Sequence, residues 1–250
     1  MYPILFQYGK FKIYSYGVFI ACAFTISFIY LLYSLNKSIN KIFSENALYT
    51  LYIYIMIISI LGSRLLYVIM NLRYFILNPI SIYQLWNGGL IYYGGLISSI
   101  MLCVIYSYKH NISILQLGDF LVPGLSLGHS IGRVGCLFSG CCYGKPSNVP
   151  WSIIFNNTNS FAMTGKHLHP TQIYEAVMNL CIFVILHFYS KQHCKSGTVF
   201  SIYLVLYGIG RFIIEFFRCD FRISFVNLSI AQIISIFILI FGILIICKRQ

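Results

Sequence analysis

Long apolar runs dominate this chain and restrict what it can fold into. A helix of about 20 apolar residues crosses the hydrocarbon core of a bilayer, and seven runs approach that length. Only 9% of the 250 residues are charged and 59% are apolar, whereas soluble domains carry about 25% charged residues. The sequence therefore predicts an all-α integral membrane protein with about seven transmembrane helices in a single domain, 1–250. The predicted spans are 14–34, 47–71, 88–107, 112–136, 171–189, 198–217 and 228–247.

The basic residues outside these spans indicate an orientation. The net charge of +12 fits anionic lipid head groups, and no nucleic-acid partner is expected. Each side holds seven basic residues, but one set lies in roughly 27 loop residues and the other in over roughly 70, and short loops decide orientation. We therefore expect a cytoplasmic C-terminus, an external N-terminus and a small extracytoplasmic head at 137–170. The cytoplasmic set is Lys37, Lys41, Lys109, Lys191, Lys195, Lys248 and Arg249, and the external set is Lys10, Lys12, Arg73, Lys145, Lys166, Arg218 and Arg222.

The third and fourth spans contain residues that disturb regular helices. Gly88 and Gly89, Gly94 and Gly95 form two pairs, and Pro123 lies inside the fourth span. Such helices are either broken or packed closely against their neighbours. Tyr92 and Tyr93 stand between the two glycine pairs, where the backbone allows close approach.

Ionisable side chains inside the apolar runs are the most informative residues. Arg64, Arg133 and Arg211 lie in or at the edge of predicted spans, as do Glu175 and Glu215. An arginine at the bilayer centre costs at least ~2.5–3.5 kcal/mol, so it faces a partner or a watery cavity.

The acids are too few to pair with every arginine. Arg211, Glu215 and Arg218 are spaced so that they share one helix face. One interpretation is an Arg211–Glu215 ion pair that holds the bundle together, but it leaves Arg64 and Arg133 unexplained. The surplus of buried positive charge favours an anionic ligand, because guanidinium binds phosphate bidentately. In a membrane, the abundant phosphate belongs to a lipid.

The start of the fifth span adds a histidine. His169 precedes it, and Thr171 is expected to cap the helix. A histidine in this position is more often structural than catalytic.

Three of the nine cysteines, Cys136, Cys141 and Cys142, cluster after His129. The odd total rules out a complete set of intrachain disulfides. Four interpretations stay open for the cluster: a disulfide, which an extracytoplasmic location permits; inert packed thiols; a zinc or other metal site, although the spacing is not that of paired CxxC motifs; and a thiol made reactive by a nearby arginine. The site that we predict includes no metal and no cofactor.

Four further cysteines lie in apolar runs, where we interpret them as small hydrophobic side chains. They are Cys22, Cys103, Cys181 and Cys247.

Together these motifs resemble prolipoprotein diacylglyceryl transferases, a bacterial inner-membrane enzyme family. The resemblance runs nearly end to end, and its specificity comes from the order and spacing of the motifs. The matching stretches are Tyr16-Gly17, Gly62-Ser63-Arg64, GGLIYYGGL at 88–96, Asp119-Phe120 with Pro123, GRVG at 132–135, HPTQIYE at 169–175, YGIGRFIIEFFR at 207–218 and Gln232.

The resemblance implies a reaction and a site. It implies transfer of a diacylglyceryl group from phosphatidylglycerol, or another anionic phospholipid, to the lipobox cysteine thiol of a prolipoprotein signal peptide. Glycerol phosphate leaves, and a thioether forms. The catalytic residues are predicted to be Arg133, Arg211, Tyr93 and Glu215. The substrate-binding residues are predicted to be Arg133, Tyr16, Arg64, Gly94, Gly95, His169 and Arg218.

Three positions depart from the pattern of this family. The family typically has His where this chain has Tyr93, and Asn and Glu where it has Cys136 and Cys141. A tyrosine hydroxyl is a poor base at neutral pH. Relative to the family pattern, the residues expected to bind phosphate are the same in this sequence. The residues expected to contact the acceptor thiol are different. Two alternatives therefore stay open: the same donor with a different acceptor, and a phospholipid-binding membrane protein without catalysis. The absence of inverted repeats disfavours a transporter.

Overall fold

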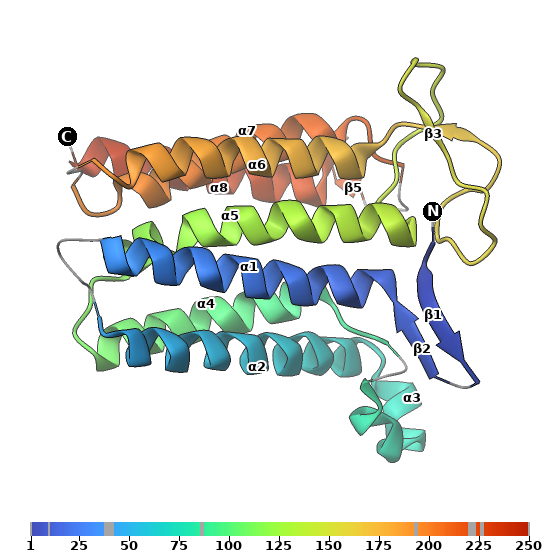
Figure 1. Cartoon of the computed structure of the whole chain (residues 1–250), viewed down its shortest axis with the longest axis horizontal. Coiled ribbons are helices and arrows are strands. Elements are labelled where there is room, and N and C mark those ends of the chain that lie inside the picture. The colour runs from blue at the N-terminus through green and yellow to red at the C-terminus, as the bar shows by residue number, and fades with distance from the viewer. Residues whose placement is uncertain are drawn as a thin grey trace. The chain divides into compact units, whose positions relative to one another are not determined.

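The fold is known from a computed structural model, which describes residues 2–9, 11–37, 43–85, 88–192, 195–219, 224–225 and 228–249. These residues contain eight α-helices and three two-stranded antiparallel sheets (Figure 1). The chain divides into two compact units: the large unit, 1–33 with 118–250, and the small unit, 34–117. The elements are β1 (Ile4–Tyr8), β2 (Phe11–Tyr14), α1 (Ser15–Lys37), α2 (Glu45–Met70), α3 (Leu72–Leu77), the 3-10 helix η1 (Pro79–Tyr83), α4 (Tyr92–Lys109), α5 (Ile114–Ser139), β3 (Ile153–Ile154), β4 (His167–Leu168), α6 (Thr171–Tyr189), α7 (Thr198–Glu215), β5 (Ser224–Phe225), β6 (Leu228–Ser229) and α8 (Ile230–Arg249).

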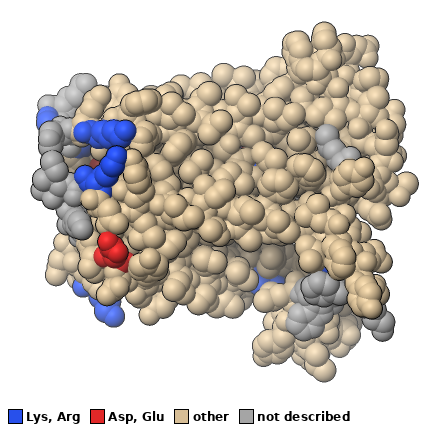
Figure 2. All heavy atoms as spheres, in the orientation of Figure 1, with Lys and Arg blue, Asp and Glu red and all other residues tan. Residues whose placement is uncertain are grey.

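Five of the described helices, α1, α2, α6, α7 and α8, are long and apolar enough to cross a membrane. Their surfaces carry large apolar side chains such as Ile57, Phe237 and Leu244, which are exposed. Exposure to water would be unfavourable for these side chains, whereas acyl chains accommodate them. On the face that Figure 2 shows, few charged side chains are visible, and most of the surface is formed by uncharged residues. The predicted all-α membrane protein is confirmed at this level.

The third and fourth predicted spans are present as α4 and α5, which are not among these five helices. Helix α5 carries Asp119, His129 and Arg133 within its 26 residues. Polar groups of this kind suit a helix that is surrounded by protein rather than by lipid. Pro123 lies inside α5 without dividing it into two helices. Seven membrane crossings therefore stay a prediction.

Serine hydroxyls join the helices of the large unit at close range. Ser27 of α1 donates to the carbonyl of Gly124 at 2.7 Å. Ser126 and Ser130 of α5 donate to two carbonyls of α6, those of Asn179 and Ala176, at 2.7 and 2.8 Å. Small residues that let backbones approach are typical of helix packing in membranes. Helix α6 also packs on α7, and α7 on α8, so the start of α6 and the end of α7 lie at the same end of this unit.

Glycines set the contact between α2 and α4 in the small unit. A Cβ on Gly95 would lie 2.7 Å from the carbonyl oxygen of Ser59, and a Cβ on Gly62 would lie 2.7 Å from that of Gly94. No side chain fits at these distances without moving the backbone. Of the two alternatives left open for this run, a broken helix or close packing, close packing is confirmed at Gly94 and Gly95.

The segment 137–170 begins in the last turn of α5, which ends at Ser139 rather than at residue 136, and connects that helix to α6. Its strands β3 and β4 pair, and a small apolar core supports them. The core consists of Phe155, Ala162 and Leu168, with Leu137, Tyr143 and Ile153 packed against it. The sequence did not predict the β1–β2 hairpin, which precedes α1.

Candidate active site

A buried carboxylate joins three segments of the large unit. Glu175 lies near the start of α6, and its side chain is 1% exposed. Arg133 Nε from α5 lies 2.7 Å from its Oε2. Arg211 Nη1 from α7 and Arg218 Nη1 lie 3.1 and 2.7 Å from its Oε1. The sequence identified Glu175 as a buried acid but left it out of the site, because nothing in the spacing shows that one carboxylate serves three arginines.

The second buried carboxylate lies at the end of α7. Glu215 Oε2 forms an ion pair with Arg211 Nη2, which lies 2.9 Å away and comes from the preceding turn of the helix. Its Oε1 accepts a hydrogen bond from the Ser229 hydroxyl at 2.7 Å, just before α8. The Arg211–Glu215 ion pair considered from the sequence is therefore confirmed.

The prediction that Arg211, Glu215 and Arg218 share one helix face is wrong for Arg218. Helix α7 ends at Glu215, and Arg218 lies beyond it, in a β-bridge with Gly144. The amide of Lys145 donates to the carbonyl of Phe217 at 2.8 Å, which draws the chain out of the helix. The Arg218 guanidinium consequently reaches Glu175.

Arg133 is held through one side of its guanidinium. Its Nε contacts Glu175 and donates to His129 Nε2 at 3.1 Å. Its terminal nitrogens, Nη1 and Nη2, make no hydrogen bond or ion pair with any residue in the described part of the chain. These nitrogens carry N–H donors in the fork geometry that a phosphate group accepts. The contact from His129 was not predicted, although a histidine four residues before an arginine on one helix is a signal for it.

The arginine cluster, which we define as Arg133, Glu175, Arg211, Glu215 and Arg218, carries a surplus positive charge. Three guanidinium groups face two carboxylates, so the net charge is +1, and no side chain among them is more than 14% exposed. An uncompensated buried charge is costly, and an anion bound to this cluster would offset it. The expectation that Arg133 lacks an acid is wrong, because Glu175 is shared, but the predicted surplus is present.

The hydrogen-bond donors of Arg64 are paired with main-chain carbonyls and not with carboxylates. Its guanidinium donates to five main-chain carbonyls of the small unit, and it lies 5.6 and 5.4 Å from the ring centroids of Tyr67 and Phe75. The argument that Arg64 needs an acid or an anion is therefore wrong, because backbone oxygens take its place. The accepting carbonyls are those of Ser81, Ile82, Gln84, Gly88 and Gly89.

Two predicted tyrosines lie at helix starts. Tyr16, in the first turn of α1, is close to α5, since a Cβ on Gly135 would lie 3.5 Å from its ring. Tyr93, in the first turn of α4, makes an edge contact with Tyr92 and is 46% exposed. Tyr93 belongs to the small unit, so its place beside the arginine cluster stays a prediction.

Residues at the start of α6 form hydrogen bonds with one another and with the loop after α5. His169 Nδ1 lies 3.1 Å from the Tyr174 hydroxyl, which also accepts from Trp151 at 2.7 Å. Thr171 does not cap α6 as predicted. Its hydroxyl donates instead to the Cys142 carbonyl at 2.7 Å, and Pro170 occupies the cap position.

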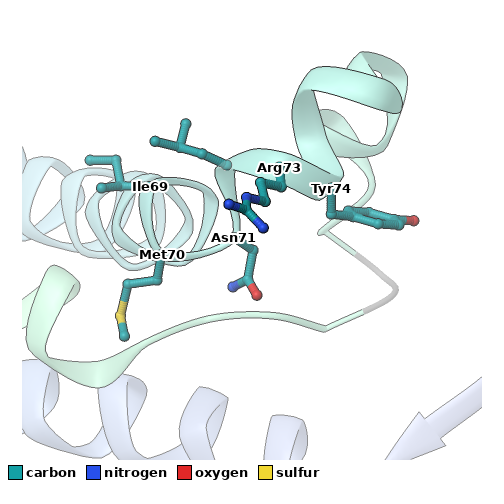
Figure 3. A pocket seen from close by; sticks show the side chains of 6 residues that line it. Ile69, Met70, Asn71, Arg73 and Tyr74 are labelled. Carbon is teal, nitrogen blue, oxygen red and sulfur yellow. The ribbon is translucent and has the colours of Figure 1, made fainter.

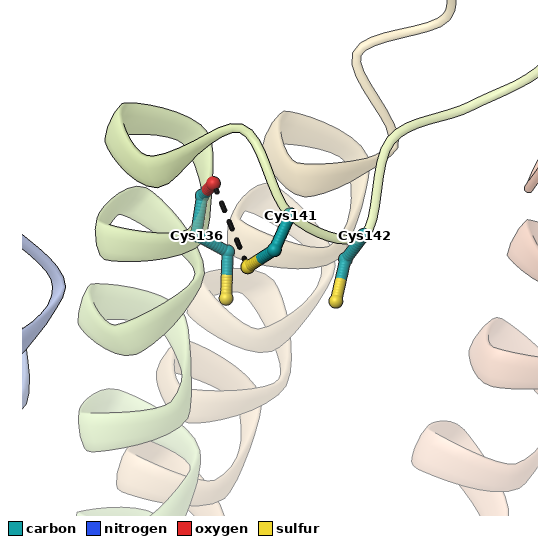
Figure 4. Close-up of side chains that lie close together, drawn as sticks. All are labelled: Cys136, Cys141 and Cys142. Carbon is teal, nitrogen blue, oxygen red and sulfur yellow. Dashed lines mark hydrogen bonds between the residues drawn. The ribbon is translucent and has the colours of Figure 1, made fainter. Parts of the chain in front are cut away.

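The three clustered cysteines lie at the end of α5 (Figure 4). The sulfurs of Cys136, Cys141 and Cys142 all lie within 4.8 Å of one another, and each thiol is free. The Cys141 thiol approaches the Cys136 carbonyl at 3.8 Å and the Ser139 hydroxyl at 3.2 Å. The cluster is adjacent to the arginine cluster, because Arg133 precedes Cys136 by one turn of α5.

A hollow in the small unit lies where α2 turns into α3 (Figure 3). Its lining comes from one continuous stretch, which contains no predicted site residue, so the hollow adds nothing to the candidate site. The lining residues are Ile69, Met70, Asn71, Leu72, Arg73 and Tyr74.

Comparison with known proteins places the chain in a family. The family model for prolipoprotein diacylglyceryl transferase matches residues 3–248. A phosphatidylglycerol–prolipoprotein diacylglyceryl transferase of Clostridium tetani is 39% identical, over 97% of this chain and 96% of that protein. A second such protein, from Clostridium perfringens, is 36% identical over 93% and 90%, and one from Staphylococcus xylosus is 31% identical over 99% and 89%. The chain therefore belongs to the prolipoprotein diacylglyceryl transferase family.

Proposed function

We propose that this transferase moves a diacylglyceryl group from phosphatidylglycerol to the lipobox cysteine of a prolipoprotein. The names of its relatives specify this donor and an acceptor of this class. The observation that carries the proposal is Arg133, whose terminal nitrogens are unpaired within the described residues, in a buried cluster of net charge +1. A phosphodiester, with a charge of −1, is an anion of matching charge and geometry.

Each member of the arginine cluster has a part in binding the donor. The fork of Arg133 binds two phosphate oxygens, and Glu175 fixes the orientation of that fork through Nε. Arg211 is held by both Glu175 and Glu215, so it supplies positive charge at a fixed position. Such preorganised charge is effective in catalysis because it needs no rearrangement when the reaction occurs.

The reaction forms a carbon–sulfur bond. The acceptor thiolate attacks the glyceryl carbon that bears the phosphate oxygen, the carbon–oxygen bond breaks, and the electron pair leaves with glycerol phosphate. The phosphate group gains one negative charge, from −1 to −2. Arg133 and Arg211 stabilise that charge as it develops, which is their catalytic role.

The group that deprotonates the acceptor thiol must lie elsewhere. Both carboxylates of the cluster are ion-paired with arginines, so neither is a free base. Tyr93 stays a proposed contact of the acceptor, because its hydroxyl is on an exposed side chain. Tyr16 stays a proposed donor contact. For Arg64, Gly94, Gly95 and His169, we propose that they position backbone and helices around the substrates rather than bind them.

We also propose seven membrane crossings, with the head 137–170 and the N-terminus outside the cytoplasm. Helices α4 and α5 supply the two further crossings. In the large unit, Lys191 and Lys195 follow the end of α6 and Lys248 lies at the end of α8, opposite the end that carries the arginine cluster. Short basic loops of this kind face the cytoplasm. Lys10, Lys41 and Arg222, also used for this orientation, lie outside the described residues.

Replacement of Arg133 tests donor binding. In Arg133→Ala, we expect the affinity for labelled phosphatidylglycerol in detergent, and the transfer rate, to fall at least ~100-fold, because one fixed oxyanion donor is worth about that much. Arg133→Lys keeps the charge but lacks the fork, and should recover only part of the loss. Arg73→Ala, in the exposed turn at α3, is the matched control. Unchanged lipid affinity in Arg133→Ala would contradict the proposal.

A further inference from the structure

The reaction proposed above assigns no role to the three clustered cysteines, Cys136, Cys141 and Cys142. Cys136, Cys141 and Cys142 are the one group of at least three potential metal ligands found among the described residues. Tetrahedral zinc with Zn–S bonds of about 2.3 Å needs sulfurs about 3.8 Å apart. The three sulfurs already lie within 4.8 Å of one another. Their separation is therefore close to the one that a common zinc ion requires.

The loop is built to bring the three sulfurs together. Cys142 has a φ of +60° and Gly140 a φ of +76°. The left-handed conformation costs a side-chain-bearing residue about 1–2 kcal/mol. Two bonds from α6 hold the loop in this shape: Thr171 donates to the Cys142 carbonyl, and Gln172 donates to that of Cys141 at 2.8 Å. In Figure 4 the Cys141 side chain extends from the loop toward Cys136 on α5, and Cys142 follows it on the same loop.

Positive charge lies beside the cysteine cluster, because Arg133 precedes Cys136 by one turn of α5. The residue that would bind the donor phosphate is therefore close to these three cysteines. The two sites are therefore neighbours in the large unit.

We propose that Cys136, Cys141 and Cys142 bind one zinc ion, whose fourth coordination position takes the thiol of the acceptor cysteine. The inference rests on the proposed function. Structural zinc sites have four protein ligands, whereas catalytic sites have three and an open position. Among the described residues no further histidine, cysteine or carboxylate joins the group, as an open position requires.

Zinc coordination supplies the thiolate that the ion-paired carboxylates cannot produce. A thiol bound to zinc loses its proton, here to water at the membrane surface. The bound sulfur gives an electron pair to the glyceryl carbon, and the pair from the carbon–oxygen bond leaves with glycerol phosphate. The thioether product carries no charge and dissociates from the ion. Zinc is neither oxidised nor reduced.

Metal analysis of the purified protein is the first test. The full chain, isolated in detergent without a histidine tag, should contain about one zinc ion. Cys141→Ser and Cys142→Ser should each bind zinc at least ~100-fold more weakly, since loss of an outer-shell partner alone costs about 10–100-fold. Cys103→Ser, in α4, is the matched control. The inference would be overturned by protein that contains no zinc and takes up neither zinc nor cobalt. A disulfide within the cluster in untreated membranes would also overturn it.

The open position is tested on the wild-type chain, which avoids variants that fail to fold. With Co²⁺ in place of zinc, a lipobox peptide should change the visible spectrum, and the same peptide with serine for cysteine should not. Removal of the metal should slow transfer at least ~100-fold, and zinc should restore it. Full transfer by metal-free protein would overturn the zinc inference and leave the proposed function intact. A thiol-dependent spectrum without any release of glycerol phosphate would contradict the proposed function.

Discussion

Among single residues, Glu175 determines how the candidate site is built. Its two oxygens contact three arginines from two helices and the turn after α7, and the side chain is 1% exposed. Buried ion pairs of this kind contribute modestly to net stability, but the loss of one partner leaves the others uncompensated. Glu175 therefore orients Arg133 for the donor and also holds three segments together.

Replacement of Glu175 by glutamine should therefore destabilise the protein. Three guanidinium groups would then face a single carboxylate, and we expect unfolding free energy to fall by about 3–5 kcal/mol. Unfolding by sodium dodecyl sulfate titration measures the change. Glu45→Gln, on an exposed residue at the start of α2, is the control and should have little effect. A Glu175→Gln variant as stable as that control would show that the arginines do not depend on Glu175.

Buried charge could be recognised from the sequence at residue level, but its partners could not. The surplus of arginine over acid predicted an anion site, and the structure has that surplus in the arginine cluster as a whole. Sharing of Glu175 is invisible in the sequence, because the contacts come from residues 36 to 43 positions away. Arg64 was misjudged because main-chain carbonyls, which every residue carries, replace acids as its partners.

At the level of elements, glycine spacing explains the contact between α2 and α4. Gly95 lies against the Ser59 carbonyl, whereas Gly17 in α1 has no neighbouring atom within 4 Å of its Cβ position. The two glycines therefore have different roles, although both lie in helices.

We predict opposite effects of alanine at these two positions. Gly95→Ala should destabilise by about 1–3 kcal/mol through overpacking. Gly17→Ala should be neutral or stabilise by about 0.5–1 kcal/mol, because alanine is the better helix former. The free energies of unfolding of both variants, measured by titration with sodium dodecyl sulfate, test this prediction. Equal curves would mean that α2 and α4 do not pack as closely as described.

Helices were more predictable than the other elements. Each of the seven predicted spans overlaps one long helix, because about 20 apolar residues leave few alternatives. The β1–β2 hairpin and α3 were missed, since each of these elements has six residues or fewer, too few for a periodic pattern. The end of α7 was placed two residues late because only the bridge to Gly144 ends the helical path.

For the whole molecule, the orientation in the membrane is the main open prediction. Alkaline phosphatase fused after Asn157, in the head, should be active, because it would lie outside the cytoplasm. Green fluorescent protein at the C-terminus should fluoresce, because it would lie inside. The reverse pattern would contradict the orientation and the external location of the site.

The central claim is that the arginine cluster supports transfer chemistry and does more than bind lipid. The cluster lies wholly in the large unit, whereas Tyr93 lies in the small unit. An assay of transfer with purified protein tests the arginine cluster and Tyr93 separately, through one variant of each. In that assay, Tyr93→Phe also decides whether its hydroxyl takes part.

The most direct measurement uses purified protein in detergent, phosphatidylglycerol labelled in its glyceryl and phosphate groups, and a lipobox peptide. We predict a thioether-linked diacylglyceryl peptide and one glycerol phosphate released for each peptide modified, both lost in Arg133→Ala. Phosphatidylglycerol that binds but stays intact through prolonged incubation with the peptide would contradict the account.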